Sequence, residues 1–183
     1  MWGLPTSVDI AGREYEIRSD YRAVLDICAA LSDPELDGQE KAVVVLDIFY
    51  PEIGIMPQED YEEAIKKCFA FINCGEEESK HQRKAPKLVD WEQDFRYIVA
   101  PINRVAGREI RTVEYMHWWT FISFYYEIGD CLFAHIVSLR DKIARGKTLD
   151  KEERAWLREN RHLVDFRNKY TEAENEIVKQ WIK

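Results

Sequence analysis

The chain has 183 residues, of which 46% are hydrophobic, 33% charged and 13% aromatic, a composition that excludes a disordered chain and fits one medium domain or two small ones. The net charge of −8 is uneven, because residues 1–75 hold fifteen acidic and six basic residues, a balance of −9, while the remainder carries +1. An acidic protein without a basic stripe repels phosphate backbones, so we expect no nucleic-acid partner.

Neither a targeting segment nor a membrane span is expected. Residues 1–7 lack a basic region and an apolar run, and no apolar stretch elsewhere is long enough to cross a bilayer. Four cysteines are too few for a disulfide scaffold, and three of them, Cys28, Cys68 and Cys131, fall at apolar helix positions. We therefore expect a cytosolic protein whose thiols, including that of Cys74, are reduced.

Residues 1–75 predict a β-hairpin followed by three helices. Apolar and polar residues alternate on both sides of Ala11-Gly12, which is typical of two strands joined by a tight turn. Asp20 and Asp37 are suited to cap the first two helices, and Pro57 opens the third. The expected inward faces are Tyr21, Val24, Leu25, Cys28 and Leu31, then Ala42, Val45, Leu46 and Phe49, then Tyr61, Ala64, Ile65, Cys68, Phe69 and Ile72.

Residues 76–87 are charged and contain no apolar side chain larger than alanine apart from Pro86, so they predict a flexible linker. Asp90 then caps a helix whose inward side is Trp91, Phe95, Ile98, Val99 and Ile102. Pro101 should kink this helix or shorten it by a turn, and Gly107 ends the segment.

Residues 114–126 carry seven aromatic rings without a glycine or proline, and Thr112 can cap a helix there. Such a helix is apolar nearly all round, so its own domain or another chain must cover it. Its two stripes are Tyr115, Trp118, Trp119, Ile122 and Tyr126, and His117, Phe121, Phe124 and Ile128.

Gly129-Asp130 ends the aromatic helix, and a further helix with Leu132, Ile136, Leu139 and Ile143 inward runs to Gly146. Asp150 resembles the start of a capping box for a short helix through Trp156 and Leu157, and Thr171 repeats the signal for a last helix ending near Trp181. We predict a mainly α fold with helical bundle-like domains and a short N-terminal β-hairpin. Its segments are 1–75, the linker 76–87, the aromatic-rich 88–146 and the charged 147–183.

No catalytic, cofactor-binding or metal-binding constellation is readable. The four histidines, His81, His117, His135 and His162, lie far apart, and no zinc, phosphate-loop or nucleophile-elbow motif occurs. A DNA-reading helix after Gly129 would need polar or basic residues where the chain has Asp130 and apolar residues. We expect a protein that is not an enzyme.

The remaining signal is apolar surface. Packing in the core is the first explanation of the aromatic rings. However, Trp118 and Trp119 point about 100° apart on a helix, and one small domain would not bury both. The exposed part would then form a groove for an apolar partner helix. The candidate partner-binding residues are Trp91, Tyr115, Trp118, Trp119, Phe121, Tyr125 and Tyr126.

Residues 87–94 (KLVDWEQD), residues 117–121 (HWWTF) and the helix to Arg145 resemble a family of small proteins of long-tailed phages and prophages of Gram-positive bacteria. Its members are commonly encoded just before the tape measure protein and are regarded as tail assembly chaperones or minor tail proteins. The resemblance spans about residues 8–150, and the charged segment after Gly146 departs from it. The matching motif positions are Asp90, Trp91, Asp94, His117, Trp118, Trp119 and Phe121.

The resemblance implies a helical protein, without catalytic residues, that binds the tape measure protein in the host cytoplasm before the tail tube polymerises. A structural minor tail or connector component that stays in the virion and self-associates is the alternative. An enzyme or regulator that uses a cleft between the two helical groups is a third hypothesis.

Overall fold

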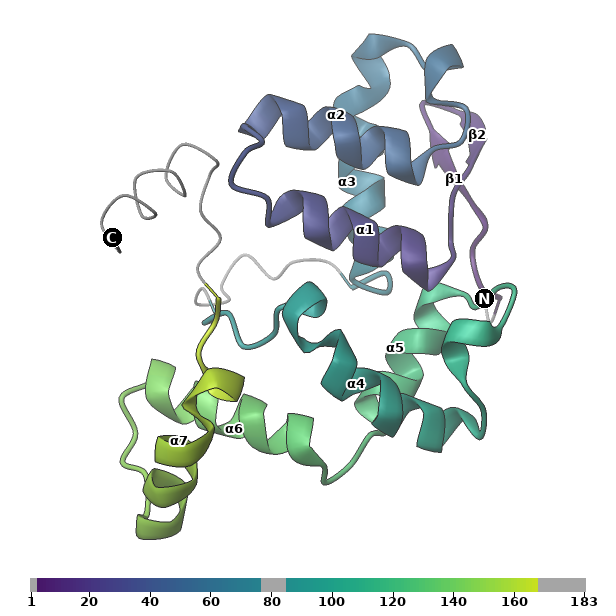
Figure 1. Cartoon of the computed structure of the whole chain (residues 1–183). Helices are drawn as coiled ribbons and strands as arrows, with labels where there is room; N and C mark the ends of the chain where they lie inside the picture. The colour runs from purple at the N-terminus through teal and green to yellow at the C-terminus, as the bar shows by residue number, and fades with distance from the viewer. Residues whose placement is uncertain (1–2, 77–84, 168–183) are drawn as a thin grey trace, which may run out of the picture. The chain divides into compact units, whose positions relative to one another are not determined.

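The computed structural model describes residues 3–76 and 85–167, which form two compact units. The first unit contains residues 3–76 and the short segment 115–119, and the second contains residues 85–114 and 120–167. Helices predominate in both units, and the strands of the described chain form one N-terminal hairpin (Figure 1), so the predicted mainly α fold is confirmed. Most of the predicted linker and the predicted helix after Thr171 lie outside the described residues.

The predicted hairpin is confirmed. Strand β1 (Ser7–Ile10) pairs antiparallel with β2 (Arg13–Glu16), with Val8 opposite Tyr15. Both turn residues have positive φ, 50° at Ala11 and 80° at Gly12, which is the geometry of the tight turn that suits the twist of a hairpin. Ile10 and Tyr15 are buried, so the hairpin is held by one apolar face.

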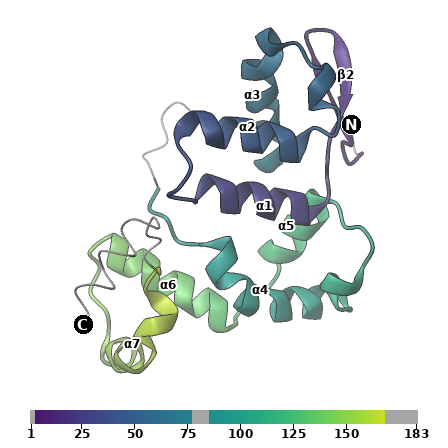
Figure 2. The ribbon, with the colours of Figure 1, turned by 45° about the horizontal axis from the view of Figure 1, so that its top comes forward.

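Three helices complete the first unit: α1 (Tyr21–Leu31), α2 (Gly38–Phe49) and α3 (Tyr61–Ile72). The two predicted caps are present, since the Asp20 side chain accepts from a backbone N–H of α1 and Asp37 forms a capping box with α2. Helices α1 and α2 lie side by side in both ribbon views (Figures 1 and 2) and pack against each other. Short 3-10 turns at Ile53–Ile55 and Gln58–Asp60 lead into α3.

The core of the first unit corrects two predicted faces. Ile27 is fully buried on α1, where the sequence pattern favours Leu25 and Cys28. On α3 Phe71 is buried and Phe69 is 38% exposed. The Phe71 ring lies between the rings of Phe49, 5.3 Å away, and Trp119, 5.9 Å away, so long-range aromatic packing sets the inward face of the last turn.

The second unit contains α4 (Trp91–Ala106), the 3-10 turn Ile110–Thr112, most of α5 (Trp118–Tyr126), α6 (Leu132–Ala144) and α7 (Lys151–Val164). Helix α6 packs against both α4 and α7, and Figure 2 shows α7 beside α6. The first two residues of α5 belong to the first unit.

The predicted shortening of α4 at Pro101 is wrong. The helix continues through Pro101 to Ala106 and ends at Gly107, whose φ of 67° is left-handed. Side chains beyond the proline secure the last turn, because Asn103 accepts a hydrogen bond from the Ile110 backbone N–H and Arg104 donates to the Ile128 carbonyl.

The aromatic helix is shorter than predicted. Thr112 ends a 3-10 turn instead of capping a helix, and α5 begins only at Trp118. Residues 115–117 are not helical because their backbone pairs with residues 19–21, at the start of α1. The Tyr21 N–H donates to the Met116 carbonyl at 2.9 Å, and the Trp118 N–H donates to the Ser19 carbonyl at 2.7 Å.

Helices α6 and α7 also differ from the sequence pattern. Leu132 and Ile143 are about half exposed, whereas Phe133 is buried. Cys131 precedes α6 as its N-cap and does not lie on an apolar helix face, since its Sγ accepts from the Ala134 N–H. Helix α7 continues past its predicted end to the buried Val164, with non-helical dihedral angles at Asn160.

Candidate functional site

The seven candidate aromatic residues fall into two groups. Tyr115, Trp118 and Trp119 belong to the first unit, and Trp91, Phe121, Tyr125 and Tyr126 belong to the second. A continuous helix through residues 114–126 would have presented most of them together. The extended backbone of residues 115–117 removes that arrangement, so each group is described by itself.

Trp118 and Trp119 support the fold of the first unit. Trp118 is 2% exposed and its indole Nε1–H donates to the Ile72 carbonyl, while that of Trp119 donates to the Phe71 carbonyl, both at 2.9 Å. These carbonyls belong to the last turn of α3, beyond which the helix supplies no further N–H, and the Phe71 carbonyl also accepts from the Cys74 N–H at 3.0 Å. The two indoles therefore cap α3 and are tied to the interior.

The polypeptide around His117 is fixed by Asp20. One oxygen of the Asp20 carboxylate accepts from the Met116 N–H at 2.9 Å, in addition to its capping bond within α1. His117 is buried, and its Nδ1 accepts from the Trp119 N–H, so its Nε2 carries the hydrogen and donates to the Pro5 carbonyl at 2.9 Å. The HWW part of the predicted motif is thus a structural anchor.

The second group forms a connected aromatic cluster. The ring of Tyr125 lies 5.1 Å from that of Trp91, 5.9 Å from that of Tyr126 and 6.0 Å from that of Phe133. Trp91 also contacts Phe121 at 6.1 Å. The cluster therefore joins the start of α4, the end of α5 and the start of α6 through ring contacts within one unit.

This cluster has a buried base and an open side. Phe121 and Phe133 are buried, Trp91 and Tyr125 are partly exposed, and Tyr126 is 75% exposed. Burial raises the pKa of the Tyr125 hydroxyl to about 12, so this ring carries no charge near neutral pH. We call Trp91, Tyr125 and Tyr126 the aromatic surface. It offers amphipathic rings on an apolar support, the residue type that anchors protein interfaces.

Polar residues hold the Trp91 end of this surface. Asp90 caps α4 by accepting from the Gln93 N–H at 3.0 Å, and the Asp94 side chain accepts from the Asp90 N–H at 2.9 Å. Asp94 is fully buried and forms an ion pair with Arg140 of α6 at 2.6 Å. The DWEQD motif is therefore the polar framework that positions Trp91.

The same framework holds the chain that follows α7. Gln93 donates to the Asp165 carbonyl at 3.0 Å and accepts from the Arg167 N–H at 2.8 Å. The guanidinium of Arg140 lies over the ring of Phe166, 4.1 Å from its centroid. The motif residues Gln93 and Asp94 thus bond to residues more than 40 positions away in the sequence. The spacing of residues within the motif does not reveal these partners.

Within residues 3–76 and 85–167, no three His, Cys, Asp or Glu side chains are placed to hold a metal ion. None of the helices in these ranges has the length and apolar character that a bilayer crossing requires.

Comparison with known proteins agrees with the bacteriophage resemblance. The family model described as Bacteriophage Gp15 protein matches residues 3–166. No curated protein sequence and no solved structure matches the chain significantly. Since the family match covers both units, this protein belongs to the Bacteriophage Gp15 protein family.

Proposed function

We propose that this protein is a tail assembly chaperone that binds the tape measure protein, in the cytoplasm of the host, before the tail tube forms around it. The bacteriophage family supports an assembly role. The observation that carries the proposal is the aromatic surface, where Tyr126 is 75% exposed beside the partly exposed Tyr125. The protein would act by binding alone, without catalysis or a cofactor.

The proposed mechanism is that the aromatic surface covers an apolar stripe on a helix of the tape measure protein. A long amphipathic helix aggregates unless its apolar face is covered, and aromatic rings on a rigid support bury large area at a low cost in side-chain entropy. The rings of Trp91 and Tyr125 are held by their neighbours, so the surface needs little reorganisation on binding. Several copies along one tape measure would act together through avidity.

The acidic first unit supports the same role. Residues 1–75 carry a balance of −9, so each bound copy would add negative charge to the complex. Coated tape measure chains would repel each other, which keeps them soluble until the tube subunits arrive.

Co-expression with the adjacent tape measure protein tests the proposal. The wild-type protein should keep the tape measure in the soluble fraction, and Tyr126→Ser should lose most of that effect. Ile55→Ser is the matched control, because Ile55 is 69% exposed but belongs to the first unit and is not part of the aromatic surface. Circular dichroism melts would verify that both variants are folded. Equal solubility with wild type and Tyr126→Ser would contradict the proposed surface.

The alternative, a structural tail component, predicts a different result in purified particles. A chaperone should be absent from mature virions in mass spectrometry, whereas a minor tail or connector protein should be present at fixed stoichiometry. Stoichiometric retention would replace the chaperone role with the structural one.

A further inference from the structure

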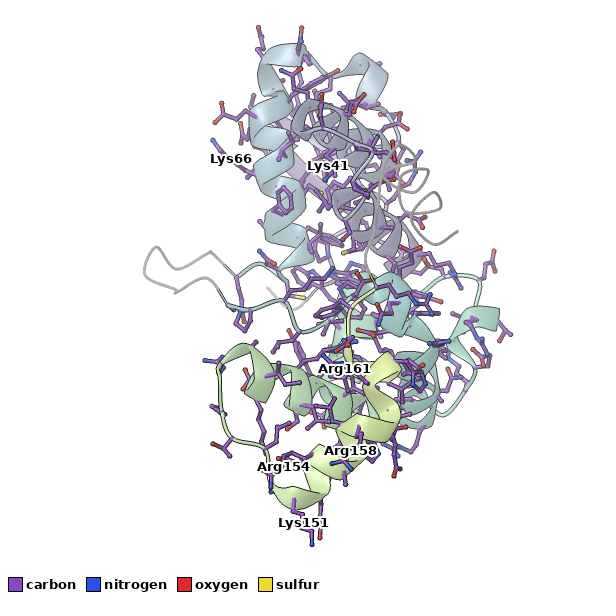
Figure 3. The ribbon with its side chains drawn as sticks, turned by 60° about the vertical axis from the view of Figure 1, so that its left-hand side comes forward. Lys41, Lys66, Lys151, Arg154, Arg158 and Arg161 are labelled. Atoms are coloured by element: carbon purple, nitrogen blue, oxygen red, sulfur yellow. The ribbon has the colours of Figure 1, made fainter. Side chains whose placement is uncertain are left out.

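Helix α7 carries a stripe of positive charge that the sequence analysis did not predict. Lys151, Arg154, Arg158 and Arg161 are exposed and follow one another along the helix (Figure 3). At 100° per residue Lys151, Arg154 and Arg158 occupy an arc of about 60° and a length of about 10 Å, and Arg161 follows just after the non-helical Asn160. We call these four residues the basic stripe. Acidic residues interleaved in the sequence hide this spacing, which corrects the expectation that the chain has no basic stripe.

Much of this positive charge is available to a partner. Lys151 and Arg158 have no ion-pair partner within residues 3–76 and 85–167. Arg161 pairs with the exposed Asp165 at 2.8 Å, and Arg154 uses one N–H on the Leu149 carbonyl. The opposite side of α7 packs against the rest of the second unit, since the ring of Trp156 contacts the ring of His135 on α6.

The first unit contains an open groove of about 670 Å³, lined by the end of β2, the start of α1, the end of α2 and Tyr115. Four carboxylates line it, those of Glu16, Asp20, Asp26 and Asp47. Its two arginines, Arg18 and Arg22, leave it with a net charge of −2. We call it the acidic groove.

Both arginines of the acidic groove are engaged locally. Arg18 donates to the Asp47 and Ile48 carbonyls at 2.6 and 2.8 Å, at the C-terminal end of α2. Arg22 pairs with Asp20 at 3.0 Å. The side chains of Glu16, Asp26 and Asp47 have no ion pair or hydrogen bond within the part of the chain that the structure describes.

The apolar part of the groove suits long cationic side chains. Ile17, Ile48, Pro51 and the Tyr115 ring lie among its lining residues, and the Tyr115 hydroxyl is held by Ser19 Oγ at 2.7 Å. Lysine and arginine place their methylene stems on such surfaces and their charged ends on carboxylates. The groove therefore fits a segment that presents Lys or Arg in series.

We propose that the basic stripe of one copy binds the acidic groove of a second copy. The two oppositely charged surfaces are different parts of the same chain, so the contact is head-to-tail. A dimer formed in this way still has an unoccupied stripe on one copy and an unoccupied groove on the other. Repetition of this contact builds a ring or a filament. A nucleic acid is a poorer partner for the stripe, because the first unit of the same chain repels phosphate.

The oligomeric state of the full-length protein tests this contact. Sedimentation velocity should show mass increasing with protein concentration at about 0.05 M salt, and a return to monomer at about 0.5 M salt, where charge pairs are screened. A wild-type protein that stays monomeric at every concentration in low salt would overturn the proposal.

Charge reversal identifies the two surfaces. The variant Arg154→Glu/Arg158→Glu, whose stripe has no net charge, and the variant Asp26→Lys/Asp47→Lys, whose groove carries +2 instead of −2, should each be monomeric, because the attraction between stripe and groove is then removed or reversed. Mixing the two should restore association between unlike copies, because the unchanged stripe of the groove variant can then bind the unchanged groove of the stripe variant. All four positions are exposed, so both variants should fold, which circular dichroism would verify.

Lys41→Glu/Lys66→Glu is the matched control. It changes the net charge by the same amount as reversal of the two stripe arginines, at positions outside the stripe and the groove (Figure 3). This control should associate as wild type does. Loss of association in the control, or association that persists in both reversed variants, would overturn the proposed contact.

Discussion

Arg140 forms a two-pronged ion pair with Asp94, at 2.6 and 3.0 Å, across 46 residues of sequence. Both side chains are buried, with 3% and 0% exposure. The same guanidinium donates to three carbonyls, those of Leu88, Leu163 and Val164. One side chain therefore joins the residues before α4 to the end of α7.

Arg140→Met should lower the free energy of unfolding by about 3–5 kcal/mol, because it leaves a buried carboxylate unpaired. Arg145→Met, at the C-cap of the same helix, is the control. Arg145 is half exposed and pairs with Asp141 at the surface, so its loss should cost about 1 kcal/mol or less. Urea denaturation followed by tryptophan fluorescence measures both, and equal effects would contradict the central role of Arg140.

Trp118→Ala should lower the free energy of unfolding by about 3–5 kcal/mol, since it opens a cavity and removes the donor that caps α3 at Ile72. Tyr126→Ala should change it by only about 0.5 kcal/mol, because that ring is mostly in solvent. Thermal melts compare the two variants. A large loss with Tyr126→Ala would show that this ring supports the fold and would weaken its assignment to a binding surface.

Pro101→Ala should raise the stability of the protein. Proline in a helix interior costs up to about 3 kcal/mol relative to alanine, and the substitution restores the N–H that can donate to the Tyr97 carbonyl. The helix is continuous on both sides of this position. A higher melting temperature is expected. A lower melting temperature would mean that the packing of the Pro101 ring, which is partly buried, stabilises the protein more than the hydrogen bond that alanine would allow.

The Glu109 carboxylate should titrate well below its ordinary pKa. Its pKa is lowered from 4.5 to about 2, chiefly because the Arg111 side chain donates to both of its oxygens, at 2.8 and 2.9 Å. A folded-state pKa below the unfolded value means that this pairing stabilises the protein above about pH 4.5 and is lost as the pH falls toward 2. Carboxyl NMR titration measures the shift. In Arg111→Met the Glu109 pKa should return toward 4.5.

Cys68 should resist alkylation in the folded protein. Burial raises the pKa of its thiol to about 12 and that of Cys28 to about 11, so almost no thiolate is present near pH 8. Cys74 is only partly buried and should react first of these three. Iodoacetamide labelling read by mass spectrometry gives the order, and in denaturant all four cysteines should react. Rapid native labelling of Cys68 would contradict its buried position.

Local interactions made much of the fold predictable from the sequence. The caps at Asp20, Asp37, Asp90 and Asp150 each bond to a backbone N–H two or three residues away, so their sequence pattern is sufficient to locate the start of a helix. The hairpin turn at residues 11–12 is equally local. The family resemblance likewise rested on short motifs within the chain, and the match over residues 3–166 agrees with its bacteriophage origin.

Tertiary structure alone decided which aromatic rings are exposed. The periodicity of residues 114–126 treats Trp118, Phe121 and Tyr126 alike, yet the first two are buried and the third is exposed. The difference comes from bonds across the chain, such as those from residues 116 and 118 to the backbone near Ser19, which shorten the helix and turn its first rings inward. Sequence spacing fixes the direction of a side chain relative to its own helix, but burial depends on what the rest of the fold places against that side.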